Sequence, residues 1–338
     1  MNTNNTTIVV DAMGGDNSPF KVLKGIEIFN KSHSNTDILL FGDQNIINET
    51  LISNSLKLNN IQIFNTTDNI KDNDTANTIL RKKKNSSIFQ GLNHVKNNKN
   101  FSGFVSAGNT GALMILSRLL LGMLEDIDRP AICSLIPNRK DFCIMLDLGA
   151  NSTVVAKNLF QFALMGYSYH TLLKPNEQPK IGIVNIGTED HKGLEFLKEA
   201  HDLISHSFLK DYFIGFVEPN KITSGICDII ISDGYTGNII LKTAEGLSSF
   251  ITNNLKNVFN KSLKNKISYK IIESDLKIFR DQINPDKYNG ASLLGVNGIS
   301  IKSHGNASPY AFSYALDKCY NLIKNNFNMQ IRNNLTRL

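Results

Sequence analysis

The stretch that decides the fold reads Phe104-Val-Ser-Ala-Gly-Asn-Thr-Gly-Ala-Leu-Met114. It begins with two apolar residues, passes through a polar turn with two glycines, and continues with leucines at helical spacing up to Leu120. A strand, a turn and a helix in this order form the repeating unit of α/β proteins. Further apolar segments at 7–11, 38–41 and 61–64, separated by helical patterns, predict that this unit belongs to a mainly parallel sheet.

The glycine-rich turn is a candidate phosphate site. A helix that begins directly after such a turn presents unpaired backbone N–H groups and the positive end of its dipole, which suits a phosphate or an oxyanion. An ordinary capped turn is the alternative, since Asn109 or Thr110 can cap the helix without any ligand. The candidate phosphate-binding residues of the turn are Ser106, Gly108, Asn109, Thr110 and Gly111.

Length and composition are those of a soluble globular protein. The chain has 338 residues, 41% hydrophobic and 20% charged, which is enough for one large α/β unit or two domains and for a large core; we expect a single catalytic unit spanning 1–338. Its four cysteines lie far apart and form no Cys-x-x-Cys pair, so we expect buried thiols in a reducing cytoplasm. The start is polar and no long apolar run occurs, so neither a secretion signal nor a membrane span is predicted.

The charge balance favours acidic partners. A net charge of +6 suits an acidic protein, a phosphate ligand or an anionic membrane surface. Nucleic acid is not predicted, because the chain has no tryptophan, no basic stripe interleaved with aromatic residues and no recognisable nucleic-acid module.

Acids, glycines and asparagines recur where predicted strands end. Carboxyl ends of parallel strands meet at one edge of a sheet, where ligands bind, so we expect these turns to lie at one edge of one sheet. The alternative is that they are only good turn formers. The candidate residues are Asp11, Gly14, Gly15, Asp16, Asp147, Asn151, Gly187, Asp233 and Asn238.

Two other features are candidates for chemistry. A basic run, Arg81-Lys-Lys-Lys84, precedes the glycine-rich turn; it is either a solvated face or the source of a cation, Arg81 or Lys83, for the phosphate site. His304 is the one histidine of seven that we place in a loop at a strand end, next to Gly305, which favours an acid or base role over a purely structural one.

Residues 247–285 differ in character from the rest. Apolar residues repeat at helical spacing while lysines supply charge, which predicts an amphipathic helical pair. Core or dimer packing is one use of such an insert, and contact with an anionic membrane surface is another.

Taken together, these segments resemble the bacterial acyl-carrier-protein:phosphate acyltransferases of the PlsX type. The resemblance extends over almost the whole chain in order and shares one segment with phosphotransacetylases, Gly237-Asn-Ile239 followed by Lys242. The segments that carry it are Val10–Asp16, Ser106–Leu113, Arg129–Ala131, Leu146–Asn151, Asn185–Gly187, Asp233–Asn238, Leu241–Lys242, Glu245–Gly246, Leu293–Gly295 and Ser303–Gly305.

The resemblance implies a fold and a reaction. The fold is a three-layer α/β/α arrangement like that of isocitrate and isopropylmalate dehydrogenases, with a protruding helical pair. The reaction is transfer of a fatty acyl group from acyl carrier protein to inorganic phosphate. Its acyl phosphate would serve phosphatidic acid and phospholipid synthesis through a membrane glycerol-3-phosphate acyltransferase. A homodimer in the cytoplasm, associated peripherally with the inner membrane face, is expected.

For this reaction we predict direct attack by phosphate, without an acyl-enzyme. The turn at 108–111, with Lys242 or Arg81, would hold phosphate, and Asn109 or Asn238 would donate to the oxyanion. His304 would act as acid or base, with Asp233, Asp147 or Asp11 orienting it or a phosphate proton. No metal is predicted, because the acids are dispersed, and no cofactor, because no Gly-x-Gly-x-x-Gly turn follows the first strand.

Two alternatives remain at this point. One is a phosphotransacetylase that uses acyl-CoA as the donor. The other is a non-catalytic module that binds phosphate without transferring an acyl group.

Overall fold

A computed structural model describes residues 6–71, 73–99, 101–189, 191–282 and 284–336. The ends of the predicted unit 1–338 and position 283 of the predicted insert 247–285 lie outside the described residues.

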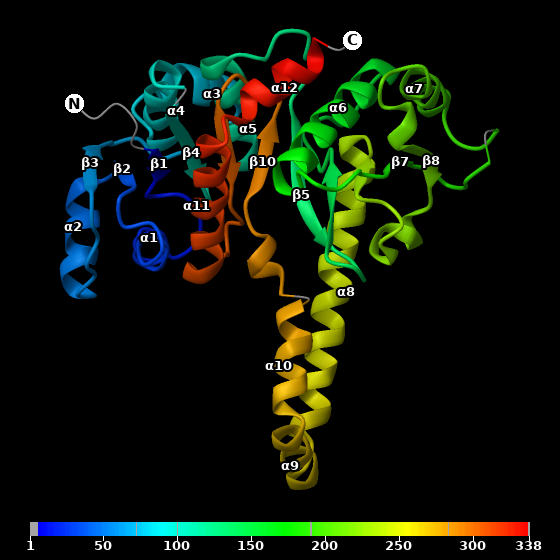
Figure 1. Cartoon of the computed structure of the whole chain (residues 1–338). Helices are drawn as coiled ribbons and strands as arrows, with labels where there is room; N and C mark the ends of the chain where they lie inside the picture. Colours follow the sequence, from blue (N-terminus) through cyan, green and yellow to red (C-terminus); the bar gives the residue numbers. More distant parts are fainter. Residues whose placement is uncertain (1–5, 72, 100, 190, 283, 337–338) are drawn as a thin grey trace.

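Helices and strands alternate along most of the chain (Figure 1). The strands are β1 (Thr7–Asp11), β2 (Asp37–Gly42), β3 (Ile61–Asn65), β4 (Ser102–Ser106), β5 (Ala131–Pro137), β6 (Phe142–Leu146), β7 (Ile181–Val184), β8 (Phe213–Val217), β9 (Ile229–Ile231), β10 (Ala291–Leu294) and β11 (Ile299–Lys302). The α-helices are α1 (Phe20–Asn30), α2 (Gln44–Ser53), α3 (Ala76–Lys82), α4 (Ser87–Asn97), α5 (Thr110–Leu121), α6 (Ala156–Leu173), α7 (Glu195–Ser205), α8 (Gly234–Asn260), α9 (Leu263–Ile271), α10 (Glu273–Gln282), α11 (Pro309–Lys324) and α12 (Phe327–Leu335).

The described strands form one sheet in the order β3-β2-β1-β4-β11-β10-β5-β6-β9-β7-β8. Most neighbours pair in parallel, and only the pairs β11–β10, β10–β5 and β5–β6 are antiparallel. The prediction of an α/β fold with a mainly parallel sheet is therefore confirmed.

The three antiparallel pairs reverse the direction of the sheet. Since β10 opposes β11, β5 opposes β10 and β6 opposes β5, the strands β6, β9, β7 and β8 run opposite to β1, β2, β3, β4 and β11. Asp11 and Ser106 thus lie at one edge of the sheet, and Asp147 and Asp233 at the other. The expectation that all the acid- and glycine-bearing turns share one edge was wrong.

Alternation along the strands divides the core into two sides. Ile8 and Val10 of β1 belong to a core cluster that includes residues of α1, α6, α7, α11 and α12, whereas Val9 between them belongs to a second cluster with residues of α3, α4 and α5. Since successive side chains of a strand point to opposite faces, both faces of the sheet are covered, which gives three layers.

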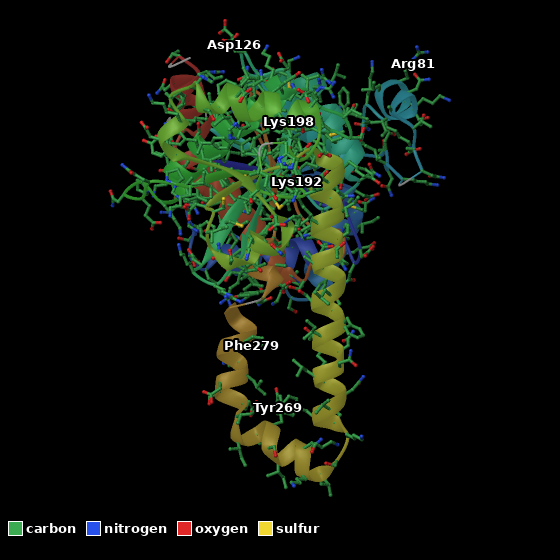
Figure 2. All side chains as sticks on the ribbon, turned by 90° about the vertical axis from the view of Figure 1, so that its right-hand side faces the viewer. Arg81, Asp126, Lys192, Lys198, Tyr269 and Phe279 are labelled. Carbon is green, nitrogen blue, oxygen red and sulfur yellow. The ribbon has the colours of Figure 1, made fainter. Side chains whose placement is uncertain are left out.

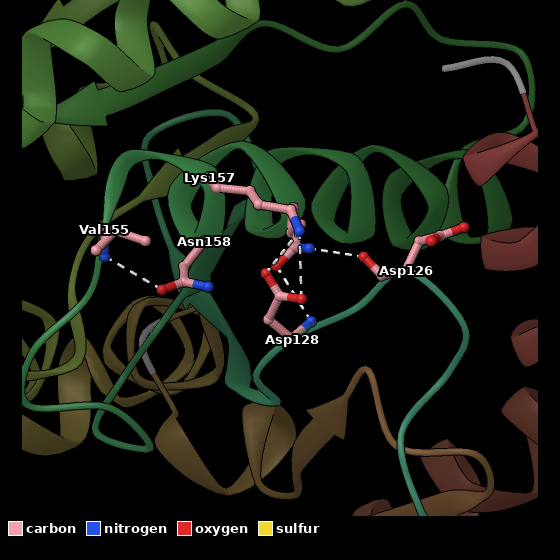
Figure 3. Close-up of polar contacts among 6 residues, drawn as sticks. Asp126, Asp128, Val155, Lys157 and Asn158 are labelled. Atoms are coloured by element: carbon pink, nitrogen blue, oxygen red, sulfur yellow. Dashed lines mark hydrogen bonds and ion pairs between the residues drawn. The ribbon is translucent and has the colours of Figure 1, made fainter.

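The loop before β5 is fixed to α6 by polar contacts (Figure 3). Gln161 donates from Nε2 to the carbonyl oxygen of Asp126 at 2.6 Å, and its Oε1 accepts from the Asp128 N–H at 3.3 Å. Lys157 also pairs with the Asp128 carboxylate at 3.0 Å. These contacts hold the entry to β5, the strand that links the two directions of the sheet.

Helices α8, α9 and α10 form an arm that projects from the body (Figure 1). Large apolar side chains along it are exposed, among them Phe250 on α8 and Leu263 and Ile271 on α9. Tyr269 of α9 makes an edge contact with the Phe259 ring at 5.3 Å between centroids, which joins the tip to the end of α8. In the part of the chain that the structure describes, no helix is long and apolar enough to cross a membrane.

The packing of α11 on α1 gives a test of the core. Phe312 is fully buried, and Gly25 of α1 lets the two helices approach, because a Cβ there would lie 2.9 Å from the Phe312 ring. Phe312→Ala should lower the free energy of unfolding by about 3–5 kcal/mol, measured by urea denaturation. Ile52→Ala, at an exposed position of α2, is the control. Equal urea midpoints for the two variants would contradict this packing.

Candidate active site

A pocket of about 670 Å³ opens at the carboxyl ends of β1 and β4. Three segments converge on it: 13–16 after β1, 69–71 after β3, and 107–111, which runs from the end of β4 into the first turn of α5. Lys302 and Gly305, at and after the end of β11, complete it. A larger groove of about 940 Å³ between α6 and α7 is lined by Glu199 and Asp202 and, among the described residues, by no lysine or arginine, which makes it unfavourable for an anion.

The buried carboxylate of Asp11 ties the pocket walls together. Its Oδ1 accepts hydrogen bonds from the Ser87 hydroxyl at 2.6 Å and the Met13 N–H at 3.0 Å, and its Oδ2 accepts from the Ser106 hydroxyl at 2.6 Å. The Ser106 oxygen accepts in turn from the Gly108 N–H at 2.9 Å. Asp11 and Ser106 therefore shape the loops around the pocket.

Gly15 lets the loop after β1 close over the pocket. Its φ of +80° lies in the left-handed region, and a Cβ there would lie 2.6 Å from Lys21 Nζ and 2.7 Å from the Gly305 carbonyl oxygen. That oxygen accepts from Lys21 Nζ at 2.6 Å and from the Asp16 N–H at 2.8 Å. The loop after β1 is thus bound to the loop after β11.

Lys21 was not among the predicted residues. It is buried, and desolvation lowers the pKa of its ammonium while Asp16 and Asp11 oppose that effect. In the sequence it is one helical lysine among many, so no local pattern distinguished it.

The start of α5 presents backbone donors to the pocket. Asn109 caps the helix, since its Oδ1 accepts from the Ala112 N–H at 2.8 Å. Thr110 and Gly111 are exposed and line the pocket, and among the described residues no acceptor is found for their N–H groups. This combination of unpaired donors and a helix N-terminus favours an anion.

Cations reach the pocket from two places. Lys71 lies in the loop after β3, and Lys302 lies at the end of β11, where its Nζ donates to the Ala107 carbonyl oxygen at 3.4 Å and to that of Ser303. Arg81, the predicted cation, does not line the pocket; it is exposed on the outer side of α3 (Figure 2).

His304 lies beside this pocket and close to α8. Its N–H donates to Asn289 Oδ1 at 3.0 Å, which holds the loop. Desolvation lowers the pKa of the imidazole; Glu245 opposes this, whereas Lys302 and Lys242 add to it. Lys242 itself is exposed and forms an ion pair with Glu245 at 2.8 Å. A neutral imidazole at pH 7 is able to accept a proton.

The remaining predicted acids form a separate cluster at the opposite edge of the sheet. Asp147 is buried and accepts five hydrogen bonds, from the N–H groups of Ile132, Gly149, Ala150 and Asn151 and from the Asn151 side chain. Burial raises the pKa of its carboxyl, and the bonds from Ala150 and Asn151 oppose that rise. All its acceptor capacity is used in fixing this turn.

Asp233 and its neighbours start α8 against that turn. Asp233 caps the helix by accepting from the Thr236 N–H at 2.8 Å, and a Cβ on Gly237 would lie 2.0 Å from the Asp147 carbonyl oxygen. Asn238 is exposed near Gly149, and Gly187 is buried against Lys192. The structure therefore does not bring Asp147, Asn151, Asp233, Asn238 or Gly187 into the pocket at β1 and β4.

The cysteines offer no nucleophile. All four are buried and unpaired, as predicted, and desolvation raises the pKa of each thiol, to about 12 for Cys133, Cys143 and Cys227. A thiol protonated at neutral pH does not attack a thioester.

Alanine substitutions at two glycines distinguish the effect of filling the pocket wall from the effect of backbone strain. Gly15→Ala should reduce phosphate affinity at least tenfold, because the new Cβ displaces Lys21 and the Gly305 carbonyl. Gly122→Ala is the matched control: its φ is +75°, but a Cβ meets nothing within 4 Å. Isothermal titration with phosphate measures both. Equal phosphate affinities for the two variants would show that phosphate does not bind in this pocket.

Comparisons with known proteins agree with this architecture. A family model described as "Fatty acid synthesis protein" matches residues 6–330. The phosphate acyltransferase of Pelagibacter ubique (strain HTCC1062) is 40% identical over 329 residues, which cover 97% of this chain and 98% of that protein. That of Paramagnetospirillum magneticum (strain ATCC 700264 / AMB-1) is 38% identical over 333 residues, covering 98% and 94%.

Solved structures share the fold at low sequence identity. A phosphotransacetylase from Streptococcus pyogenes superposes with a TM-score of 0.62 at 14% identity, covering 95% of this chain and 94% of that one. The EutD phosphotransacetylase from Staphylococcus aureus gives 0.59 at 14% identity, covering 97% and 94%. The near-complete match to the sequence relatives decides the family: the chain belongs to the phosphate acyltransferases and is an acyltransferase enzyme.

Proposed function

We propose that this enzyme transfers a fatty acyl group from acyl carrier protein to inorganic phosphate, giving acyl phosphate for phosphatidic acid and phospholipid synthesis. The observation that carries the proposal is the pocket at β1 and β4, where the N-terminus of α5, Lys71 and Lys302 converge and no nucleophilic side chain is needed. Such a pocket suits a phosphate that is itself the nucleophile.

The proposed reaction is a direct displacement. A phosphate oxygen attacks the thioester carbonyl carbon, a tetrahedral oxyanion forms, and the carbon–sulfur bond then breaks. The acyl group is then bonded to a phosphate oxygen, and the pantetheine sulfur departs as a thiolate that takes up a proton. The thiolate is a good leaving group, so positioning and charge stabilisation are what the protein must supply.

We assign the roles as follows. The N–H groups of Thr110 and Gly111, with Lys71 and Lys302, hold phosphate in place of the expected Arg81. The Asn109 side-chain oxygen caps α5. A backbone N–H of this helix start is the proposed oxyanion donor, worth about 3 kcal/mol of transition-state stabilisation. His304 takes the proton of a monoanionic phosphate, and the Lys242–Glu245 pair lies near enough to influence its charge.

We propose further that the arm has two uses. The exposed apolar side of α8, with Leu247, Phe250 and Ile251, would pack against a second copy in a homodimer. The tip, α9, repeats apolar residues at Leu263, Ile267 and Ile271 beside three lysines, which suits an anionic membrane surface. Peripheral contact with the inner face of the membrane would bring the acyl phosphate to a membrane glycerol-3-phosphate acyltransferase.

The reaction is tested by phosphate-dependent release of thiol. Palmitoyl carrier protein should release thiol only when phosphate is present, and hydroxylamine should trap one acyl phosphate for each thiol. Palmitoyl-CoA is assayed in parallel, since a phosphotransacetylase would prefer it. Turnover with palmitoyl-CoA alone would contradict the proposed donor.

The membrane contact is tested by sedimentation with phosphatidylglycerol vesicles. Ile267→Asp/Ile271→Asp should reduce binding at least tenfold, because both side chains are exposed on the apolar face of α9. Ile52→Asp/Leu194→Asp carries the same charge at exposed apolar positions of the body and should bind like the wild type. If the wild-type enzyme does not sediment with these vesicles, the arm is left with dimer packing only.

A further inference from the structure

The basic run Arg81–Lys84, which we call the basic ridge, has no role in the pocket chemistry described above. Arg81, Lys82 and Lys84 are exposed, and among the described residues none of the four forms an ion pair. Lysines elsewhere in the chain, such as Lys174 and Lys192, do pair with acids. An unpaired run of four like charges repels itself, so a structure that keeps it fixed and exposed provides a ready site for an acidic partner.

The ridge is held rigidly by its neighbours. Ile79, at the centre of α3, is buried in the same core cluster as Leu113 and Leu116 of α5. At the other end of the ridge, the Lys83 carbonyl oxygen accepts from the Ser86 hydroxyl at 2.7 Å, and that of Lys84 accepts from Gln90 Nε2 at 2.7 Å. The backbone that carries the charges is therefore ordered without a ligand.

The ridge also borders the phosphate pocket. The residue after it, Asn85, donates its N–H to the Asp68 carboxylate at 3.0 Å, and its carbonyl oxygen accepts from the Asp68 N–H at 3.2 Å. Asp68 immediately precedes the pocket-lining loop 69–71. Ser87, which bonds Asp11 in the pocket wall, follows Lys84 by three residues, a span of at most about 11 Å.

We propose that the basic ridge is the docking surface for the acidic acyl carrier protein, an inference that rests on the proposed function. A carrier bound there places its flexible pantetheine arm at the mouth of the pocket, next to the phosphate held by α5. The location favours a protein over a membrane, because Arg81 lies at the end of the molecule opposite the tip of the arm (Figure 2). A membrane that contacts α9 does not reach the ridge.

Charge reversal on the ridge tests this assignment. Lys82→Glu/Lys84→Glu should raise the KM for palmitoyl carrier protein at least tenfold at low salt and leave kcat within twofold, because surface charges at a contact act mainly on association. Its kcat/KM with palmitoyl-pantetheine, which has the thioester and the arm but no acidic protein, should not change. Lys82→Arg/Lys84→Arg should restore the wild-type KM.

The control carries the same change of charge at the other end of the sheet. Lys210 and Lys221 are exposed beside β8, the outermost strand on one side of the sheet, whereas the ridge follows β3, the outermost strand on the other side. Lys210→Glu/Lys221→Glu should leave the KM for palmitoyl carrier protein and the kcat/KM with palmitoyl-pantetheine unchanged. An equal rise in KM in the two double variants would show a general effect of net charge and would overturn the assignment.

Other outcomes distinguish failure of the proposed reaction from failure of the docking surface. Wild-type enzyme that makes no acyl phosphate from the carrier protein refutes the proposed function. Wild-type turnover with an unchanged KM in Lys82→Glu/Lys84→Glu refutes the docking surface alone. Equal loss with both donors would show that the ridge supports the pocket instead, and loss of vesicle binding in this variant would assign it to the membrane.

Discussion

The Asp11 carboxylate, buried at the end of β1, accepts hydrogen bonds from Ser87, Ser106 and the Met13 N–H. These donors come from α4, β4 and the loop after β1, so one charged group fixes three separate walls of the pocket. Hydrogen bonds to a charged acceptor are stronger than neutral ones, and a buried carboxylate without them would be unstable. The glycines at 14 and 108 follow from the same constraint, because a Cβ on either would come within 3.1 Å of Asp11 Oδ2.

Asp147 does the same work at the opposite edge of the sheet. It closes the turn after β6 and supports the start of α8, and that helix extends past His304 into the arm. The two acids thus fix the pocket at the carboxyl end of β1 and the start of α8 at the other end of the sheet. The oxygens of both carboxyl groups are used in hydrogen bonds to the turns around them.

Much of the fold could be predicted from the sequence, because apolar periodicity reports burial directly. The βα unit around Gly108 and the helical character of the segment after residue 247 follow from local patterns, whereas the pattern left the cap of α5 open between Asn109 and Thr110. The reversal of the sheet could not be predicted that way, since it arises from the long-range pairing of β10 with β5 and β11, and nothing local distinguishes an antiparallel strand of four residues.

The site was only partly predictable for a similar reason. The loops around Gly15 and Thr110 were found from their glycines and polar residues, whereas Lys21, Lys71 and Lys302 look like any other lysine until the fold brings them together. Arg81 shows the converse: its place just before the turn suggested a role in the pocket, but α3 directs it outward.

We propose that phosphate binds between the loop after β1 and the start of α5. Arsenate has the shape and charge of phosphate and gives an anomalous X-ray signal, so crystals soaked in arsenate locate the site directly. An anomalous peak is expected within about 3 Å of the Thr110 and Gly111 N–H groups, with Lys71 and Lys302 around it. A peak beside Asp147 and Asn238, with none at the start of α5, would contradict it.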